Sequence, residues 1–213
     1  MKPLGIFGGN FDPIHCGHLR TGFELLQQVQ FSELCWLPSG NPAHRETPLA
    51  DAELRLQMVR AAVADQVGFS VDDREVRRTG KSYTVLTLEE LRAERGEQPL
   101  CLILGMDAFA GLPSWYRWQD ILKLSHLIVA LRPGWSTPQS GELAALLNER
   151  RASAIEDLHA HSAGRIYVHP VTQLEISSTA LREILLAGGD PCYLVPEPVR
   201  RIIQQTGCYA RHH

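Results

Sequence analysis

The chain has 213 residues, of which 44% are hydrophobic and 21% are charged, a composition typical of a globular protein with one good core. The formal net charge of -3, from 21 basic and 24 acidic residues, argues against a broad surface for a nucleic acid polymer, so any anion site must be local. The five cysteines include no Cys-x-x-Cys pair, and nowhere do about 18 uncharged apolar residues follow one another. We therefore expect a cytoplasmic protein with reduced thiols and no membrane contact.

Short apolar runs of β type alternate with stretches of helical period along the chain. This alternation predicts the α/β class, and a near-continuous apolar run such as Leu100–Leu104 indicates a strand buried on both faces. We therefore expect a Rossmann-like, mostly parallel sheet with helices on both faces and a ligand crevice at the carboxyl ends of its strands. The predicted strands are Leu4–Phe7, Leu34–Leu37, Phe69–Val71, Leu100–Leu104, Leu127–Leu131 and Ile166–Val168. The predicted helices are Leu19–Val29, Leu54–Val63, Val85–Leu91, Trp118–Leu124, Leu143–Leu147, Leu181–Leu186 and Val199–Ile203.

The polar segments Ser39–Pro48 and Pro133–Gly141 contain proline and are predicted to be loops rather than linkers between domains. The sequence contains no internal repeat and no low-complexity tract. We therefore expect a single domain over residues 1–213, with a C-terminal helical part from about residue 177, and a protein that is a monomer or a weak homo-oligomer.

The stretch GGNFDPIHCGH, residues 8–18, joins the first predicted strand to the first predicted helix. Gly8 and Gly9 allow a phosphate to approach the main chain, and the start of a helix supplies unpaired N–H donors and positive dipole density. The stretch therefore predicts a site for a polyphosphate. It matches neither common phosphate loop, because Gly-x-Gly-x-x-Gly is absent and residues 80–82 (GKS), which resemble the end of a P-loop, follow Glu75 where the first glycine should stand. A redox dinucleotide cofactor and a P-loop NTPase are both disfavoured.

His15 and His18 are three residues apart where the helix begins, so both side chains lie near one face. Each can offer donors to phosphate oxygens when it is protonated or bonded by a neighbour. A zinc pair is one alternative, but no third ligand of matching spacing follows. Two histidines on a solvated surface are another alternative, which would leave the flanking Gly-Gly-Asn-Phe-Asp-Pro unexplained.

Residues 9–18 resemble the signature of the nucleotidyltransferase superfamily, whose members join a nucleotide to a phosphate or a phosphoester. Residues 176–182, ISSTALR, resemble the second element of that superfamily, ISSTxxR. The hydroxyls of this segment can cap a helix or meet phosphate, and Arg182 can bring a forked cation to the same place. We expect the two segments to form a clamp on the triphosphate.

Further segments resemble bacterial nicotinate mononucleotide adenylyltransferases in their order and rough spacing, and the similar landmarks run from residue 5 to residue 182. One departure is Asn10, because threonine is commoner there in this family; a backbone role would survive the change, whereas a hydroxyl contact would not. The landmarks are PAHR at 42–45, SYT at 82–84, GMD at 105–107, LPSWY at 112–116 and RPG at 132–134.

The resemblance implies a Rossmann-like fold of the nucleotidyltransferase type. It also implies the transfer of AMP from ATP to nicotinate mononucleotide, which gives nicotinate adenine dinucleotide and pyrophosphate in the synthesis of NAD. His15, His18 and Arg182 would be the catalytic residues, no residue would bind a metal, and Mg²⁺ would arrive mainly with ATP. The residues implied to bind ATP are Gly8, Gly9, Asn10, Phe11, Gly105, Asp107, Arg132, Ile176 and Ser178.

Four further residues are implied to bind the mononucleotide. Trp115 would stack on the pyridine ring, and the backbone N–H groups of Thr84 and Tyr116 would meet its carboxylate. Arg45, in a polar loop, would approach the mononucleotide or the triphosphate. A related enzyme such as phosphopantetheine adenylyltransferase is disfavoured by the length of this chain and by its SYT and SWY segments. A sensor that binds nucleotides without turnover is a rival of another class, and it would not need both HxGH and SSTxxR.

Overall fold

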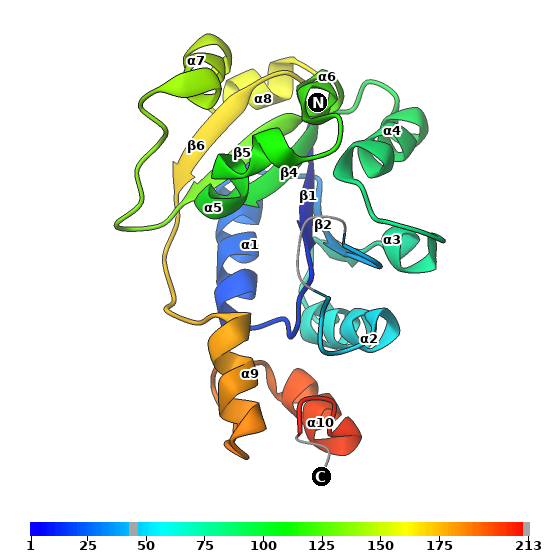
Figure 1. Cartoon of the computed structure of the whole chain (residues 1–213). Coiled ribbons are helices and arrows are strands. Elements are labelled where there is room, and N and C mark those ends of the chain that lie inside the picture. Colours follow the sequence, from blue (N-terminus) through cyan, green and yellow to red (C-terminus); the bar gives the residue numbers. More distant parts are fainter. Residues whose placement is uncertain (43–46, 211–213) are drawn as a thin grey trace.

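The computed structural model describes residues 1–42 and 47–210 (Figure 1). Within them, six strands form one sheet in the order β3-β2-β1-β4-β5-β6, and every neighbouring pair is parallel. The chain moves outward from β1 to β3, returns to the other side of β1 and moves outward again, so the strand order reverses between β1 and β4. Ligands of such sheets bind at the carboxyl ends of the strands at this point. The strands are β1 Leu4–Gly9, β2 Glu33–Pro38, β3 Phe69–Val71, β4 Leu100–Gly105, β5 His126–Leu131 and β6 Ile166–Pro170.

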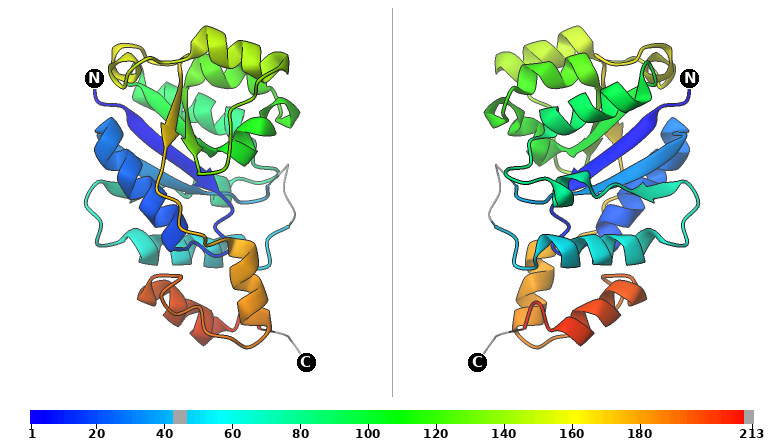
Figure 2. Two further views of the ribbon diagram at one scale, coloured as in Figure 1. Left: turned by 90° about the vertical axis from the view of Figure 1, so that its left-hand side faces the viewer. Right: turned by 90° about the vertical axis from the view of Figure 1, so that its right-hand side faces the viewer.

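Helices cover both faces of the sheet (Figure 2). Alternate residues of one strand belong to different cores, because Cys101 and Ile103 pack with α1 and α2, whereas Leu102 and Leu104 pack with α4 and α6. This confirms the predicted fold class, with strands buried on both sides. The helices are α1 Cys16–Val29, α2 Ala52–Val63, α3 Arg74–Arg77, α4 Thr84–Arg95, α5 Met106–Ala110, α6 Trp118–Leu124, α7 Gly141–Arg150, α8 Glu156–Ala160, α9 Ser178–Leu186 and α10 Glu197–Thr206, with a 3-10 turn η1 at Leu112–Ser114.

Each predicted strand and each predicted helix corresponds to an observed element, with ends that differ by a few residues. The short helices α3, α5 and α8 were not predicted. The helix predicted from Leu19 begins at Cys16 instead, because His15 caps it, so His18 lies in its first turn.

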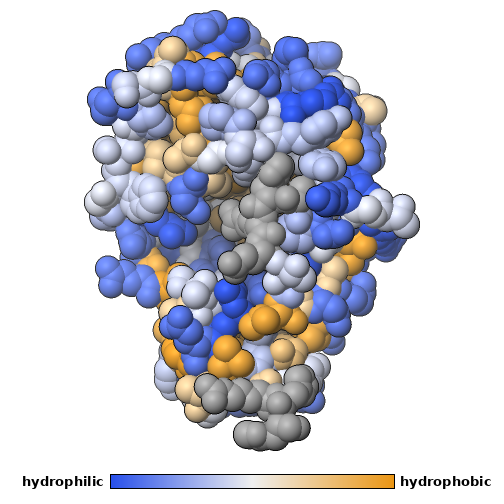
Figure 3. Space-filling view, in the orientation of Figure 1, coloured by the Kyte–Doolittle hydropathy of each residue, from blue (hydrophilic) through white to orange (hydrophobic). Residues whose placement is uncertain are grey.

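The last two helices, α9 and α10, lie together at the end of the molecule nearest the C-terminus in Figure 1, where α10 packs against α2. The face drawn in Figure 3 is mainly hydrophilic, and its hydrophobic residues are scattered over several elements. Within the described residues, no helix has the length and apolar character needed to cross a membrane.

His126 begins β5 and is completely buried. Its Nε2 lies 2.8 Å from the carbonyl oxygen of His161, and its Nδ1 accepts the N–H of Arg165 at 3.0 Å. The ring is therefore neutral, with its proton on Nε2. Burial lowers the pKa of His126 to about 4, since a second proton would face an N–H donor and a charge would lie in the core.

We expect His126 to make the fold less stable in acid. The unfolded chain takes up this proton below about pH 6.5, whereas the folded chain resists it down to about pH 4, so the free energy of unfolding falls across this window as the pH falls. The loss from this residue should be about 2 to 3 kcal/mol between pH 7 and pH 4.5. Urea unfolding of wild type and His126→Gln at the two pH values measures it. Equal losses in both proteins would contradict the assignment.

Candidate active site

The loop between β1 and α1 holds the predicted glycines and histidines together. Gly8 and Gly9 end β1, and Phe11 adopts the left-handed conformation with φ 50° while its ring is buried. His15 is extended and caps α1, because its Nδ1 accepts the N–H of His18 at 3.4 Å. The left-handed conformation of Phe11 is rare for a residue as large as phenylalanine. Such rare backbone conformations occur often in binding loops.

His15 is neutral at pH 7. The residue is 2% exposed, and burial together with the positive charge of Arg132 lowers its pKa to about 4. Since Nδ1 accepts a hydrogen bond, the proton lies on Nε2, which is left as a donor. The expected donor role therefore comes from the fixed tautomer of His15 and not from an imidazolium.

His18 is held between aromatic rings. It stacks on His15 with ring centroids 3.7 Å apart, and the edge of Phe11 meets it at a centroid distance of 5.2 Å. Phe7 lies on a further side at 6.4 Å. These contacts fix the plane of the ring, so a donor on His18 is oriented before any ligand binds.

The two predicted motifs touch each other. Ser177 caps α9 by accepting the N–H of Ala180 at 3.1 Å, and the hydroxyl of Ser178 donates to the carbonyl of Pro13 at 3.0 Å. Arg182 donates from Nη1 to the carbonyl of Asp12 at 2.9 Å, and the same atom lies 3.6 Å from the Asp12 carboxylate. The start of α9 is thus bonded directly to the loop after β1.

Asp12 is a junction that the sequence did not single out. The residue is 4% exposed. Its carboxylate accepts hydrogen bonds from the N–H of Leu49 at 2.9 Å, the N–H of Ala50 at 3.1 Å and the O–H of Tyr209 at 2.7 Å. Burial raises the pKa of Tyr209 well above its usual value, so this hydroxyl keeps its proton. Asp12 therefore connects the loop after β1 to a second loop and to a segment beyond α10.

Arg55 of α2 is a second junction that sequence reasoning missed. Its guanidinium is buried and donates to four carbonyl oxygens, at 2.6 Å to Asn10, 2.8 Å to Ser39, and 3.1 Å to both Gly40 and Ala50. These carbonyls belong to the loops that follow β1 and β2. The arginine therefore keeps the carboxyl ends of two neighbouring strands in register with α2.

Two adjoining cavities open at the point where the strand order reverses. The larger has a volume of about 730 Å³ and the smaller about 320 Å³. Residues of β1, β4 and α5 line both cavities, among them Gly9 and Asp107, and Asn10, which follows β1, and Trp115 lie in the wall of both. A connected pair of cavities can hold two reactants end to end.

The structure brings most of the predicted site residues to these cavities. Thr84 lines the smaller cavity and Trp115 lines both. Tyr116 lines neither: it is 49% exposed and its ring lies 4.7 Å from that of Tyr83. Arg45 lies outside the described residues. The larger cavity is lined by Gly8, Gly9, Asn10, Phe11, His15, His18, Gly105, Asp107, Arg132, Ile176, Ser178 and Arg182.

Gly105 and Thr84 occupy positions where the backbone matters most. A Cβ on Gly105 would lie 2.5 Å from Oδ1 of Asp107, so only glycine lets that carboxylate fold back over the end of β4. Thr84 is the first residue of α4, where N–H groups have no partner within the helix. In the part of the chain that the structure describes, no three His, Cys, Asp or Glu side chains are grouped to hold a metal ion.

Comparisons with known proteins show the family of the chain. The model of the family described as cytidylyltransferase-like matches residues 6–184. A protein of Aeromonas hydrophila named probable nicotinate-nucleotide adenylyltransferase is 45% identical over 207 residues, which cover 97% of each chain. A protein of the same name from Methylococcus capsulatus is 42% identical over 209 residues, with 98% of this chain and all of the relative covered.

The fold is also similar to solved structures. The nicotinic acid mononucleotide adenylyltransferase of Plasmodium falciparum in complex with NaAD has a TM-score of 0.75 over 98% of each chain at 16% identity. The same enzyme in complex with APC has a TM-score of 0.73 at the same identity and coverage. At this identity the likeness concerns the fold.

Proposed function

The chain belongs to the nicotinate-nucleotide adenylyltransferases of the cytidylyltransferase-like family, and we propose that its two adjoining cavities hold the two reactants of this enzyme. The AMP part of ATP is transferred to the phosphate of nicotinate mononucleotide, which gives nicotinate adenine dinucleotide and pyrophosphate. The observation that carries the proposal is the shared wall of the cavities, formed by Gly9, Asn10 and Asp107, since the reacting phosphates must meet between the two sites.

ATP occupies the larger cavity in this proposal. A phosphate oxygen of the mononucleotide attacks the α-phosphorus in line, the new P–O bond forms, and the bond to the bridging oxygen breaks so that pyrophosphate leaves with the electron pair. Both reactants are already ionised, so no strong general base is required. The neutral Nε2–H of His15, the ring of His18 and the guanidinium of Arg182 orient the triphosphate and stabilise the charge that develops on the leaving group.

The remaining contacts to ATP follow from the positions of the side chains. Asp107 accepts hydrogen bonds from ribose hydroxyls at the end of β4, and Arg132, beside the larger cavity, adds positive charge. Mg²⁺ enters with ATP as part of the substrate and neutralises charge on its phosphates.

We also propose that the enzyme works in the cytoplasm. Its five free thiols support this proposal, because thiols stay reduced in that compartment. The expected oligomeric state and the absence of a nucleic acid partner stay predictions.

Nicotinate mononucleotide occupies the smaller cavity. Trp115 offers its face to the pyridine ring, and the N–H of Thr84 at the start of α4 meets the ring carboxylate. The N–H of Tyr116, the residue after Trp115, is proposed as a second donor, although Tyr116 does not line this cavity. A carboxylate receives a charge-assisted hydrogen bond from these donors, whereas an amide presents its own NH₂ donor to them. The site should therefore prefer the acid to the amide.

Release of pyrophosphate from ATP with each mononucleotide tests the proposal. Wild type should have a much higher kcat/KM for nicotinate mononucleotide than for nicotinamide mononucleotide. Trp115→Ala should weaken recognition of the mononucleotide by about 1 to 3 kcal/mol, as for base stacking on an aromatic side chain, with little change in the KM of ATP.

Trp135→Ala is the matched control, because Trp135 is 51% exposed and lines neither cavity. That variant should behave as wild type. Equal use of the two mononucleotides by wild type would contradict the carboxylate site. Nucleotide binding without pyrophosphate release would indicate a sensor instead. A Trp115→Ala protein that loses thermal stability but keeps its KM for the mononucleotide would place Trp115 in the core.

A further inference from the structure

Glu75 is a buried carboxyl group in the wall of the smaller cavity that the mechanism above does not use. It belongs to the short helix α3, is 6% exposed as a residue, and lines the same cavity as Thr84 and Trp115. A carboxyl group in such a place is costly unless it is hydrogen-bonded and its charge is matched. The hydrogen-bond donors and the cations near Glu75 therefore show whether its charge is matched.

Two hydroxyl groups lie near this carboxylate. Thr87 Oγ1 donates to Oε1 at 2.7 Å, and the nearby hydroxyl of Ser82 helps to lower the pKa of the carboxyl group. The Ser82 oxygen also accepts the N–H of Gly40 at 3.2 Å. Both hydroxyls are neutral, so the hydrogen bond from Thr87 positions the carboxylate without pairing its negative charge.

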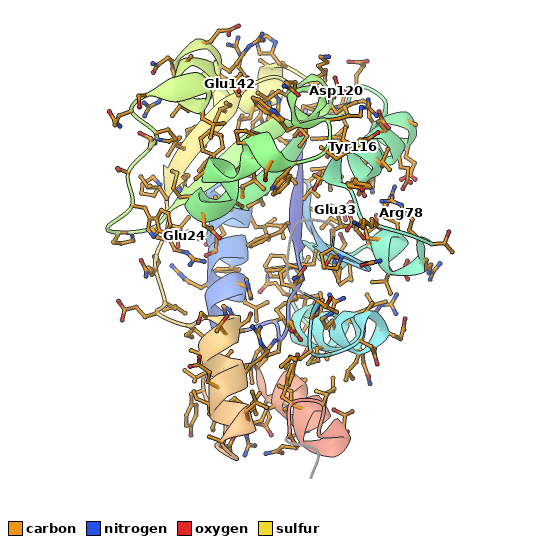
Figure 4. All side chains as sticks on the ribbon, in the orientation of Figure 1. Glu24, Glu33, Arg78, Tyr116, Asp120 and Glu142 are labelled. Carbon is orange, nitrogen blue, oxygen red and sulfur yellow. The ribbon has the colours of Figure 1, made fainter. Side chains whose placement is uncertain are left out.

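No cation is bonded to Glu75 in the described part of the chain. Arg78, which follows α3, is near enough to lower the pKa of Glu75, but its guanidinium donates to Thr87 at 2.9 Å and to Glu90 at 2.7 Å. Figure 4 places Arg78 beside α3. Burial has the larger effect and raises the pKa of the Glu75 carboxyl, because no bonded cation offsets the loss of water around its charged form.

The backbone around Glu75 holds it firmly at the cavity wall. A Cβ on Gly40 would overlap the carbonyl oxygen of Glu75, so the loop after β2 packs directly on α3. Gly40 is also bonded to Arg55, the junction of the loops after β1 and β2. The backbone of Glu75 is therefore held at the cavity wall, and the hydrogen bond from Thr87 positions its carboxylate there.

The proposed occupant of this cavity carries a positive charge. The pyridine nitrogen of nicotinate mononucleotide is bonded to ribose, so the ring is a pyridinium cation with a carboxylate substituent. The N–H groups at the start of α4 suit the carboxylate, and Glu75 is the buried anion that the same wall offers to the ring. We propose that Glu75 is a specificity-determining residue that recognises the positive charge of the pyridinium ring, an inference that rests on the proposed function of the smaller cavity.

The test compares a charged ring with a neutral ring of similar size. We would measure kcat/KM for nicotinate mononucleotide and for its reduced form, whose dihydropyridine ring carries no charge, in wild type, Glu75→Gln and Glu90→Gln. Wild type should prefer the charged ring by roughly tenfold or more. Glu75→Gln, which keeps the shape and an accepting oxygen, should reduce this preference by on the order of tenfold through the KM of the mononucleotide. Glu90→Gln removes an exposed carboxylate from the same neighbourhood and should keep the preference of wild type.

The possible outcomes distinguish a failure of the inference about Glu75 from a failure of the proposed function. A Glu75→Gln protein that uses both rings less well by the same factor would overturn the inference and leave Glu75 a structural residue. Should that variant not fold, equal use of the two rings by wild type would overturn the inference by itself. Wild type that releases no pyrophosphate with nicotinate mononucleotide would instead refute the proposed function. Since nicotinamide mononucleotide has the same ring charge, Glu75→Gln should leave the preference for acid over amide unchanged.

Discussion

Replacing His18 with alanine should lower kcat by on the order of 10² or more while the protein still folds. The ring lines the larger cavity and is fixed by His15 and Phe11 on two sides, so its donor is oriented toward the proposed triphosphate at no further cost in entropy. Charge grows on the departing pyrophosphate only as the reaction proceeds. The effect should therefore appear in kcat more than in the KM of ATP.

Turnover and urea unfolding measured on the same preparation test this expectation. His18→Gln is the matched variant, because glutamine keeps an N–H donor but loses the ring, and it should retain more turnover than alanine. Near-normal turnover in His18→Ala would remove His18 from the reaction. A large loss of unfolding free energy in both variants would instead mean that the ring serves mainly to pack against Phe7 and Phe11.

Asp12→Ala should lower the free energy of unfolding by about 3 to 5 kcal/mol. The carboxylate accepts two backbone N–H groups and the hydroxyl of Tyr209, and it faces the cation of Arg182. The substitution leaves the two N–H groups and the Tyr209 hydroxyl without this acceptor, whereas Arg182 loses the neighbouring negative charge but keeps its hydrogen bond to the backbone carbonyl of residue 12. Turnover should fall as well, because the loop after β1 loses the carboxylate that connects it to the rest of the site.

Two variants that each lose one hydroxyl group provide reference values for the loss of unfolding free energy. Tyr209→Phe removes one donor to Asp12 and should cost about 1 kcal/mol, whereas Tyr193→Phe, at a side chain that is 91% exposed, should cost nothing measurable. Urea unfolding of the three variants gives the comparison. An Asp12→Ala protein no less stable than Tyr209→Phe would show that the carboxylate is not the junction that its hydrogen bonds suggest.

Most of the fold could be predicted from the sequence because each strand and each longer helix has a recognisable local pattern of apolar and polar residues. Runs such as Leu100–Leu104 are apolar at every position, which is typical of a strand between two layers of helices. The short helices α3, α5 and α8 have four or five residues each, too few for a period of 3.6 residues to be recognised. The start of α1 was missed because it depends on the conformation of His15, which no local pattern reveals.

The candidate site also contains residues that a local motif predicts and residues that depend on contacts distant in the sequence. Residues that belong to short motifs, such as His18 and Arg182, could be predicted to lie together because the motif itself carries the signal, and both line the larger cavity. The contacts of Asp12, Arg55 and Glu75 could not be predicted, since partners lie far away in the sequence: Tyr209 is 197 residues from Asp12, and Asn10 is 45 residues from Arg55. The neutral state of His15 also depends on burial, which only the assembled fold determines.

The bond between Asp12 and Tyr209 sets an order of events during synthesis of the protein. The loop after β1 leaves the ribosome early, whereas its partner Tyr209 is added 197 residues later. At a typical rate of translation this interval is roughly 10 to 40 s. Throughout it, the nascent chain carries the loop after β1 without the hydroxyl of Tyr209 and, for most of it, without Arg182. Although this segment is made among the first, its hydrogen bonds are therefore among the last to be completed.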